Sequence, residues 1–316
     1  MKKRDLLSIR DLERGDMERL LSLAARLKGE KGRAASRLLA GKTMALVFEK
    51  PSLRTRVSFE VGMMELGGRT LFLGPDEVQL GVRESPRDCS RVLSRWVDLI
   101  VVRTFAQETV EEMARFATVP VINALTDLYH PCQVLADCLT ILEHGKRLEK
   151  LKVAFVGDGN NIVHSWMLAA EKIPFTFSLA CPEGYEPDPE VTRSARENGA
   201  RVEVTHRVEE AVRGADVVYT DVWASMGREE ERESRLKSFQ GYQVNEGVLA
   251  LAHPEALVMH CLPAHRGEEI TDAVMEGPRS VIFDQAENRL HMQKAVTLWI
   301  LGKATKTRAR KSKGRK

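Results

Sequence analysis

Short runs of apolar and often β-branched residues alternate with helical patterns along the whole chain of 316 residues. This alternation is typical of parallel sheets that are covered by helices on both faces. The sequence therefore predicts an α/β fold with two doubly wound parallel-sheet domains. The expected strands are 43–48, 70–73, 98–102 and 119–123 in the first half and 152–156, 176–180, 201–204, 216–219, 257–260 and 280–283 in the second.

The change from the first domain to the second is expected near residues 145–151, where charged residues cluster before a new strand. We expect residues 1–147 to form the first domain and residues 148–285 the second, with long helices joining them. An amphipathic helix at about 286–302 is expected to pack back on the first domain. A long helix before the junction is predicted from the stripe formed by Leu135, Leu139 and Leu142.

The C-terminal segment 303–316 holds eight lysine and arginine residues and no acidic residue. When these eight charges are subtracted from the net charge of +3, the remaining chain carries −5. The segment has too few apolar groups to pack, so it is predicted to be a disordered basic tail. Binding of RNA or of an acidic partner is the alternative. Aromatic residues make up only 6% of the chain, and we expect no nucleic-acid partner.

Five cysteines are scattered without Cys-x-x-Cys spacing, which argues against a disulfide framework and against a zinc site. The N-terminus becomes acidic too early for a targeting peptide, and no apolar run is long enough to cross a bilayer. We therefore expect a cytoplasmic protein.

An anion site is predicted where the first strand meets the following helix. Ser52 is a suitable N-cap, and Arg54, Thr55 and Arg56 follow it in the first turn of a helix that stops at Gly67-Gly68. That helix has an apolar face formed by Val57, Val61 and Met64. Free amides, hydroxyls and guanidiniums at a helix N-terminus suit a phosphate, although a capped surface helix with solvated arginines is the alternative.

Five further polar segments follow predicted strands, and the carboxyl ends of parallel strands lie at one edge of a sheet. We therefore expect a cleft between two facing domains that is lined by all six segments. The five segments are Arg103-Thr104, 127–133, 157–161, 221–227 and 260–263.

Several of these segments allow more than one interpretation. The run 157–162 begins like a dinucleotide fingerprint, but Ile162 stands where the third glycine is needed, so no nicotinamide or flavin cofactor is expected. Cys261 allows covalent catalysis, hydrogen bonding or simple packing, and covalent catalysis is the least favoured. The charge run 228–235 is expected to be a solvated face.

The motifs resemble those of the aspartate/ornithine carbamoyltransferase family in their order along the chain, from about residue 43 to residue 300. Ser-Leu-Arg-Thr-Arg at 52–56 and His-Pro-Cys-Gln at 130–133 resemble motifs that ornithine-specific members share with the aspartate-specific members. Asp221 followed by Ser-Met-Gly at 225–227, and His-Cys-Leu-Pro at 260–263, resemble its ornithine-specific members. Leu53 stands where the family commonly has threonine.

The resemblance implies carbamoyl transfer from carbamoyl phosphate to the δ-amine of ornithine, without metal or organic cofactor, in a trimer whose neighbouring subunit supplies Gln79. The implied catalytic residues are Arg103, His130, Asp221 and Cys261. The residues implied to bind carbamoyl phosphate are Ser52, Leu53, Arg54, Thr55, Gln79, Arg103, His130, Gln133, Cys261, Leu262 and Arg289. Those implied to bind ornithine are Asn161, Asp221, Ser225 and Met226.

Alternatives remain for the acceptor, which could be putrescine or an acylated ornithine, and for the direction of the reaction. A non-catalytic family member with a nucleic-acid-binding tail is a further alternative. The retained Arg54, Arg103 and His130 argue against it.

Overall fold

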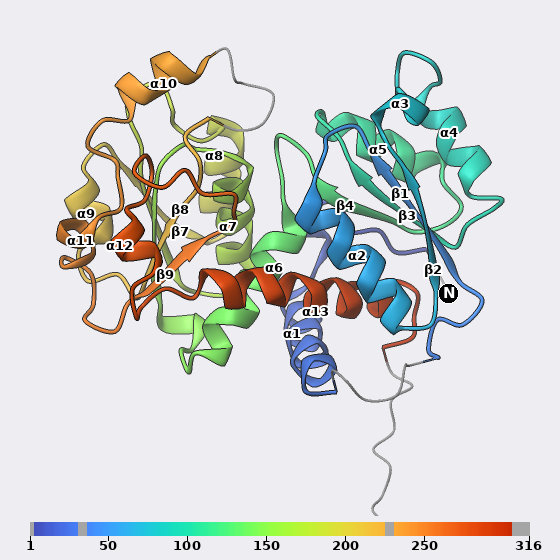
Figure 1. Ribbon diagram of the computed structural model, residues 1–316, viewed down its shortest axis with the longest axis horizontal. Coiled ribbons are helices and arrows are strands. Elements are labelled where there is room, and N and C mark those ends of the chain that lie inside the picture. The colour runs from blue at the N-terminus through green and yellow to red at the C-terminus, as the bar shows by residue number, and fades with distance from the viewer. Residues whose placement is uncertain (1–2, 31–36, 225–230, 305–316) are drawn as a thin grey trace, which may run out of the picture.

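A computed structural model describes residues 3–30, 37–224 and 231–304 and contains two parallel sheets, which confirms the predicted α/β class. The first sheet has the order β2-β1-β3-β4 and the second the order β7-β6-β5-β8-β9. Each sheet forms its own lobe (Figure 1). The first sheet contains β1 (Thr43–Phe48), β2 (Arg69–Leu73), β3 (Leu99–Arg103) and β4 (Val121–Leu125); the second contains β5 (Lys152–Val156), β6 (Thr176–Ala180), β7 (Arg201–Thr205), β8 (Val217–Thr220) and β9 (Leu257–His260).

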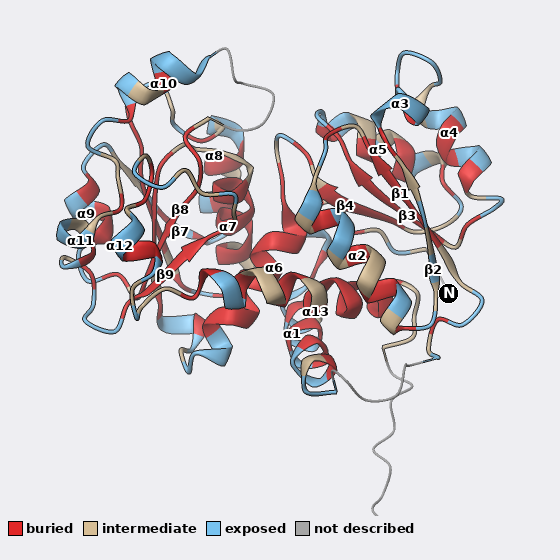
Figure 2. Ribbon diagram, viewed as in Figure 1, coloured by how far each residue is buried: buried red, intermediate tan, exposed pale blue. Residues whose placement is uncertain are grey.

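Helices cover both sheets and leave most of the strands in the interior, whereas the edge strands β2 and β7 are partly exposed (Figure 2). The first lobe contains α2 (Leu53–Glu65), α3 (Pro75–Val78), α4 (Pro86–Leu93) and α5 (Gln107–Phe116). The second contains α7 (Asn161–Lys172), α8 (Pro189–Glu197), α9 (Val208–Val212), α10 (Arg232–Ser238), α11 (Glu246–Leu249) and α12 (Asp272–Met275). Short 3-10 turns lie at η1 (Ile9–Asp11) and η2 (Leu148–Lys150).

Three helices lie at the junction of the lobes: α1 (Arg14–Gly29), α6 (Pro131–Glu143) and α13 (Ile282–Ile300). Helix α13 packs against α1, α2 and α6 and also contacts β9, so it spans both lobes (Figure 1). Every residue of α6 from Pro131 to Ile141 is buried, whereas Leu142 of the predicted stripe is exposed. The one-sided pattern was therefore incomplete, because α6 is enclosed by protein on all sides.

Nine of the ten predicted strands are present to within two residues, but the strand predicted at 280–283 is wrong. Ser280 makes only an isolated bridge to Val258, and α13 already begins at Ile282. A four-residue apolar run cannot by itself distinguish a strand from the buried start of a helix.

The apolar face predicted for α2 lies on the outside of the protein. The buried residues of α2 are Thr55, Phe59, Gly62 and Met63, whereas Met64 is 64% exposed and Val57 is also exposed. Gly62 faces α13, where the Lys294 side chain lies 3.1 Å from the position that a Cβ atom would occupy. Close helix contact through this glycine, rather than through the valines, sets the orientation of α2.

Candidate active site

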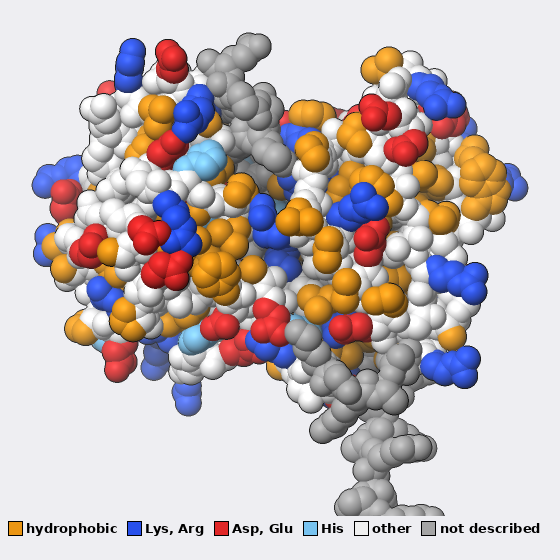
Figure 3. Space-filling model, in the orientation of Figure 1, with side chains coloured by type: hydrophobic (Ala, Val, Ile, Leu, Met, Phe, Trp, Pro, Cys, Tyr) orange, Lys and Arg blue, Asp and Glu red, His pale blue; other side chains and the backbone are white. Residues whose placement is uncertain are grey.

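The strand order of each sheet reverses at one place, between β1 and β3 and between β5 and β8. Ligands of open parallel sheets bind beyond the carboxyl ends of the strands at such a place. A cavity of about 440 Å³ lies there, between the two lobes. Figure 3 shows lysine and arginine side chains in the hollow between the lobes.

The cavity gathers residues from all six of the polar segments that the sequence singled out. Those from the first lobe and the joining helices are Lys50, Pro51, Ser52, Leu53, Arg54, Thr55, Arg103, Phe105, Leu125, Asp127, His130, Gln133 and Arg289. Those from the second lobe are Asp158, Gly159, Asn160, Asn161, Ile162, His164, Asp221, Val222, Cys261, Leu262 and Pro263.

One end of the cavity is built around the N-terminus of α2. The Ser52 hydroxyl caps the helix by accepting a hydrogen bond from the Thr55 amide at 3.3 Å. Leu53 is 74% exposed, so most of its side chain faces solvent, and its backbone amide lies in the first turn of α2 at the cavity. The substitution of threonine by leucine therefore leaves the helix N-terminus intact.

Three guanidiniums converge on this end, from Arg54, Arg103 and Arg289. Burial, with the nearby charges of Arg289 and Arg54, lowers the pKa of Arg103 to about 10, which leaves it protonated at neutral pH. The Nε atom of Arg103 is buried and has no hydrogen-bond partner within the described part of the chain. Clustered cations with unused donors favour a multivalent anion.

Helix α13 carries Arg289 back into this end. Its Nη1 donates to the Gln133 side-chain oxygen at 2.5 Å, and its Nη2 donates to the Thr55 hydroxyl at 3.0 Å. Arg289 thus ties the start of α2 to the start of α6.

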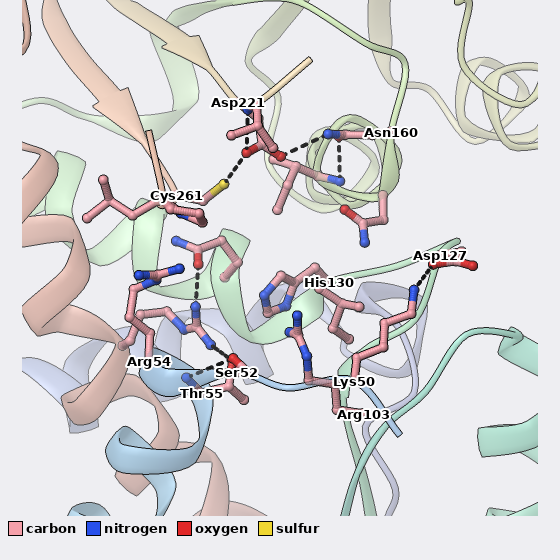
Figure 4. A pocket seen from close by; sticks show the side chains of 18 of the residues that line it. Lys50, Ser52, Arg54, Thr55, Arg103, Asp127, His130, Asn160, Asp221 and Cys261 are labelled. Carbon is pink, nitrogen blue, oxygen red and sulfur yellow. Dashed lines mark hydrogen bonds and ion pairs between the residues drawn. The ribbon is translucent and has the colours of Figure 1, made fainter. Parts of the chain in front are cut away.

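His130 caps α6 next to these arginines, and Figure 4 shows it between Arg103 and the opposite wall. Burial, together with the charges of Arg289 and Arg103, lowers the pKa of His130 well below its usual range. Its backbone amide donates to the Ser165 hydroxyl at 2.8 Å, whereas its Nδ1 has no partner among the residues described. A neutral imidazole can donate one hydrogen bond to a carbonyl oxygen without adding charge.

The opposite wall pairs Cys261 with Asp221 (Figure 4). The Cys261 thiol donates to the Asp221 carboxylate at 3.0 Å, and the Asn160 amide donates to the other carboxylate oxygen at 2.9 Å. Burial raises the pKa of both groups, that of Cys261 well above its usual range. A neutral thiol is a poor nucleophile, which disfavours covalent catalysis.

Asp221, His260 and Cys261 also place one possible metal-ligand atom each within 4.8 Å of one another. His260, however, already accepts a hydrogen bond from the Leu262 amide at Nδ1 and contacts Glu269 through Nε2. Its lone pair is therefore engaged, and the trio is better described as a hydrogen-bonded wall.

Two residues of the cavity wall, Lys50 and Asn160, were not among the predicted site residues, although Asn160 belongs to the predicted polar segment 157–161. The Lys50 side chain is 8% exposed, lies 4.1 Å from the centre of the Phe105 ring, and pairs with Asp127. Asn160 caps α7 and orients Asp221. An asparagine directly before a helix was a usable signal for the second, but nothing local distinguishes Lys50 from a surface lysine.

Among the predicted site residues that the structure describes, Gln79 does not line the cavity. Gln79 lies on the exposed segment after α3, away from the cavity in a single chain. Ser225 and Met226 lie outside the described residues. Asn161 lines the cavity, where its amide donates to the Thr126 carbonyl at 2.6 Å.

The glycine-rich turn after β5 is built for packing. A Cβ atom on Gly159 would lie 2.2 Å from the Pro187 nitrogen. The predicted solvated run 228–235 is wrong at its end, because Arg235 is buried and pairs with Asp158 at 2.8 Å. That ion pair fastens the segment after β8 to the turn after β5.

Two family models match the chain, one over each half. The family model for the carbamoyl-P binding domain of aspartate/ornithine carbamoyltransferases matches residues 4–143, and the Asp/Orn binding domain matches residues 149–300.

Individual relatives belong to the same family as these models. The chain is 54% identical to an ornithine carbamoyltransferase of Syntrophus aciditrophicus (93% of this chain and 98% of the relative). It is 50% identical to a chloroplastic one of Pisum sativum (95% and 81%). The solved ornithine carbamoyltransferase of Pyrococcus furiosus is 49% identical and superimposes with a TM-score of 0.90 (95% and 97%). The chain therefore belongs to the aspartate/ornithine carbamoyltransferase family.

Proposed function

We propose that the protein transfers the carbamoyl group of carbamoyl phosphate to the δ-amine of L-ornithine and releases L-citrulline and phosphate. The main observation behind this proposal is that the two ends of the cavity between the lobes differ in charge. Three guanidiniums and a helix N-terminus occupy one end, and the Asp221–Cys261 pair occupies the other. The family and its ornithine-named relatives support the choice of acceptor.

In this proposal, the phosphate of carbamoyl phosphate binds at the start of α2. Ser52, the Leu53 amide, Arg54, Thr55 and Arg103 hold it there. Phosphate is the leaving group, and these donors also take up the charge that develops as it departs.

The carbamoyl oxygen gains negative charge as the amine adds. Arg103, Thr55 and His130 stabilise this charge, and a preorganised donor of this kind contributes about 3 to 4 kcal/mol to the transition state. Gln133, Arg289 and the backbone of Cys261 and Leu262 hold the carbamoyl group in position.

The amine of ornithine must lose its proton before attack, since a free alkylamine has a pKa of about 10.4. Asp221 and Cys261 orient it and ease this loss, while Asn161 holds the amino-acid end. Ser225 and Met226, outside the described residues, complete this end of the site in our proposal.

We further propose a homotrimer in which Gln79 of a neighbouring chain completes the phosphate site. Two observations support it: Gln79 is exposed, and α2 carries apolar side chains on its outer face (Figure 3). The exposed apolar residues in this region are Leu53, Val57, Met64, Leu71 and Val82.

We propose a cytoplasmic location and a role in arginine biosynthesis or, in reverse, in arginine breakdown. All five cysteines are unpaired, which suits a reducing compartment. No helix in the described ranges is both long and apolar enough to span a membrane. The expected tail lies almost entirely outside the described residues.

The test is citrulline formation from carbamoyl phosphate, with ornithine, putrescine, N-acetylornithine and aspartate offered in parallel. Saturable turnover with ornithine alone is expected, and Arg103→Ala should lower it by more than about a hundredfold. Turnover with another acceptor would overturn the ornithine assignment. Absence of turnover with all four, from folded wild-type protein, would overturn the enzymatic function.

A further inference from the structure

A chain of buried hydrogen bonds runs beneath the cavity, starting at Gln133. The Gln133 side-chain oxygen accepts from Arg289 at 2.5 Å, and its amide nitrogen donates to the Asp137 carboxylate at 2.8 Å. Asp137 lies one turn further along α6, is completely buried and does not line the cavity. Its hydrogen bond to Gln133 joins it to the cavity lining.

Gln285 of α13 extends this chain into the second lobe. Its amide nitrogen donates to the same Asp137 oxygen at 2.8 Å and to the Tyr219 hydroxyl at 2.9 Å. Its side-chain oxygen accepts from the His260 amide at 2.9 Å. Because both ends of the Gln285 amide are used and the side chain is completely buried, the amide has a single favourable orientation.

The far end of the chain fixes the wall that carries Cys261. The His260 Nδ1 accepts from the Leu262 amide at 2.8 Å, and its Nε2 lies 3.0 Å from the buried Glu269 carboxylate. The backbone around Cys261 is thus held on the same residue that binds Gln285.

We propose that Asp137 and Gln285 form a positioning bridge that couples binding at the carbamoyl phosphate end of the cavity to binding at the ornithine end. The inference rests on the function proposed above. A carbamoyl group bound at Gln133 and Arg289 competes for the hydrogen bonds of these two side chains. Any resulting shift of Gln133 changes its hydrogen bond to Asp137, and this in turn changes the hydrogen bonds of Gln285 and His260. Leaving one of these buried polar groups unpaired is costly, so the chain responds as a unit.

Such coupling is reciprocal and is measured as a ratio of affinities. The probe is L-norvaline, which is ornithine without its reacting amine. Its dissociation constant is measured by calorimetry with and without saturating carbamoyl phosphate. For the wild type we expect norvaline to bind at least about tenfold more tightly when carbamoyl phosphate is present, within the usual range of 5- to 150-fold.

Two variants break the bridge from opposite sides: Gln285→Met removes both ends of the amide, and Asp137→Leu removes the shared acceptor. Each should bring the affinity ratio to within about threefold of unity. Asp137→Asn keeps an acceptor oxygen at the same place and should retain the coupling.

The matched control is Thr140→Val. The Thr140 hydroxyl accepts from the Asn288 amide at 3.0 Å, so it also bridges α6 and α13, is buried, and does not line the cavity. Its loss should leave the affinity ratio unchanged if coupling belongs to the bridge and not to helix packing in general.

Three results would overturn the inference: a wild-type ratio near one, a wild-type ratio in Gln285→Met, or an equal loss of coupling in Thr140→Val. If Asp137→Leu does not fold, the comparison of Gln285→Met with Asp137→Asn decides. Failure of the proposed function is recognised separately, because the wild type would then form no citrulline.

Discussion

Several ionisable side chains that line the cavity are buried, and burial moves the pKa of each of these in the direction that favours its neutral form. Burial is the largest cause of the raised pKa of Asp221 and Cys261 and of the lowered pKa of His130. Arg103 stays charged because its pKa falls only to about 10. At the residue scale, the site therefore combines arginine cations at one end with Asp221 and Cys261, whose pKa values are raised by burial, at the other.

Asp137 should make folding stability depend on pH. Burial raises its pKa from 3.8 to about 7. Between these values the folded protein binds more protons than the unfolded chain, so the free energy of unfolding falls as pH rises. The contribution lost from pH 5 to pH 7 is on the order of 2 kcal/mol. Asn cannot titrate, so Asp137→Asn should remove it.

The measurement is denaturant unfolding of both proteins at pH 5, 6, 7 and 8, at one protein concentration. The difference between wild type and Asp137→Asn isolates this carboxyl from the other titrating groups. A difference that is constant with pH would contradict the raised pKa.

At the scale of elements, a residue after a strand can both cap the following helix and orient a side chain of the site. The Asn160 side chain accepts from the Ile162 and Val163 amides and so begins α7, while its amide group holds Asp221. A single side chain therefore starts a helix and orients a proposed catalytic carboxylate.

Asn160→Ala should cost about 1 kcal/mol of stability and also raise the ornithine KM several-fold, because Asp221 loses its donor. The control is Asn245→Ala, since Asn245 caps α11 by accepting from the Val248 amide at 2.9 Å and does not line the cavity. That variant should lose similar stability with an unchanged KM. The KM for ornithine and the thermal stability of both variants are measured by steady-state kinetics and thermal unfolding. Equal KM values for the two variants would show that Asn160 has no role in ornithine binding.

At the scale of the whole molecule, helices α6 and α13 connect the two lobes. Both helices cross the junction, and α13 reaches from β9 to α2. The outer face of α2 has no partner within the described chain, and exposed apolar side chains there are typical of a surface between subunits.

The protein should therefore behave in solution as a particle of three times 35.5 kDa. Met64→Glu buries a charge in the proposed interface and should shift the particle toward a single chain with much lower activity. Phe283→Glu changes an equally exposed apolar side chain at the start of α13 and should keep the assembly. Analytical sedimentation measures the mass of both variants and of the wild type. An active wild-type monomer would refute the proposed trimer.

Local sequence alone determined most strands and the position of the polar segments. Strand runs such as 43–48 and 152–156 are recognisable because apolar residues of the right kind are consecutive. In a parallel sheet the segments after the strands meet at one edge, so the order of residues along the chain already brings Arg103 and His130 together at the edge of the first sheet, whereas the packing of the two lobes sets Cys261 opposite them.

Tertiary structure decided what depends on contacts between distant residues. Local pattern could not reveal that the apolar face of α2 points outward, that 281–283 leads into a helix, or that Lys50 is buried. The Asp137–Gln285 contact joins residues 148 positions apart. This contact exists because α6 packs against α13, and local sequence does not reveal which distant helix a side chain will face.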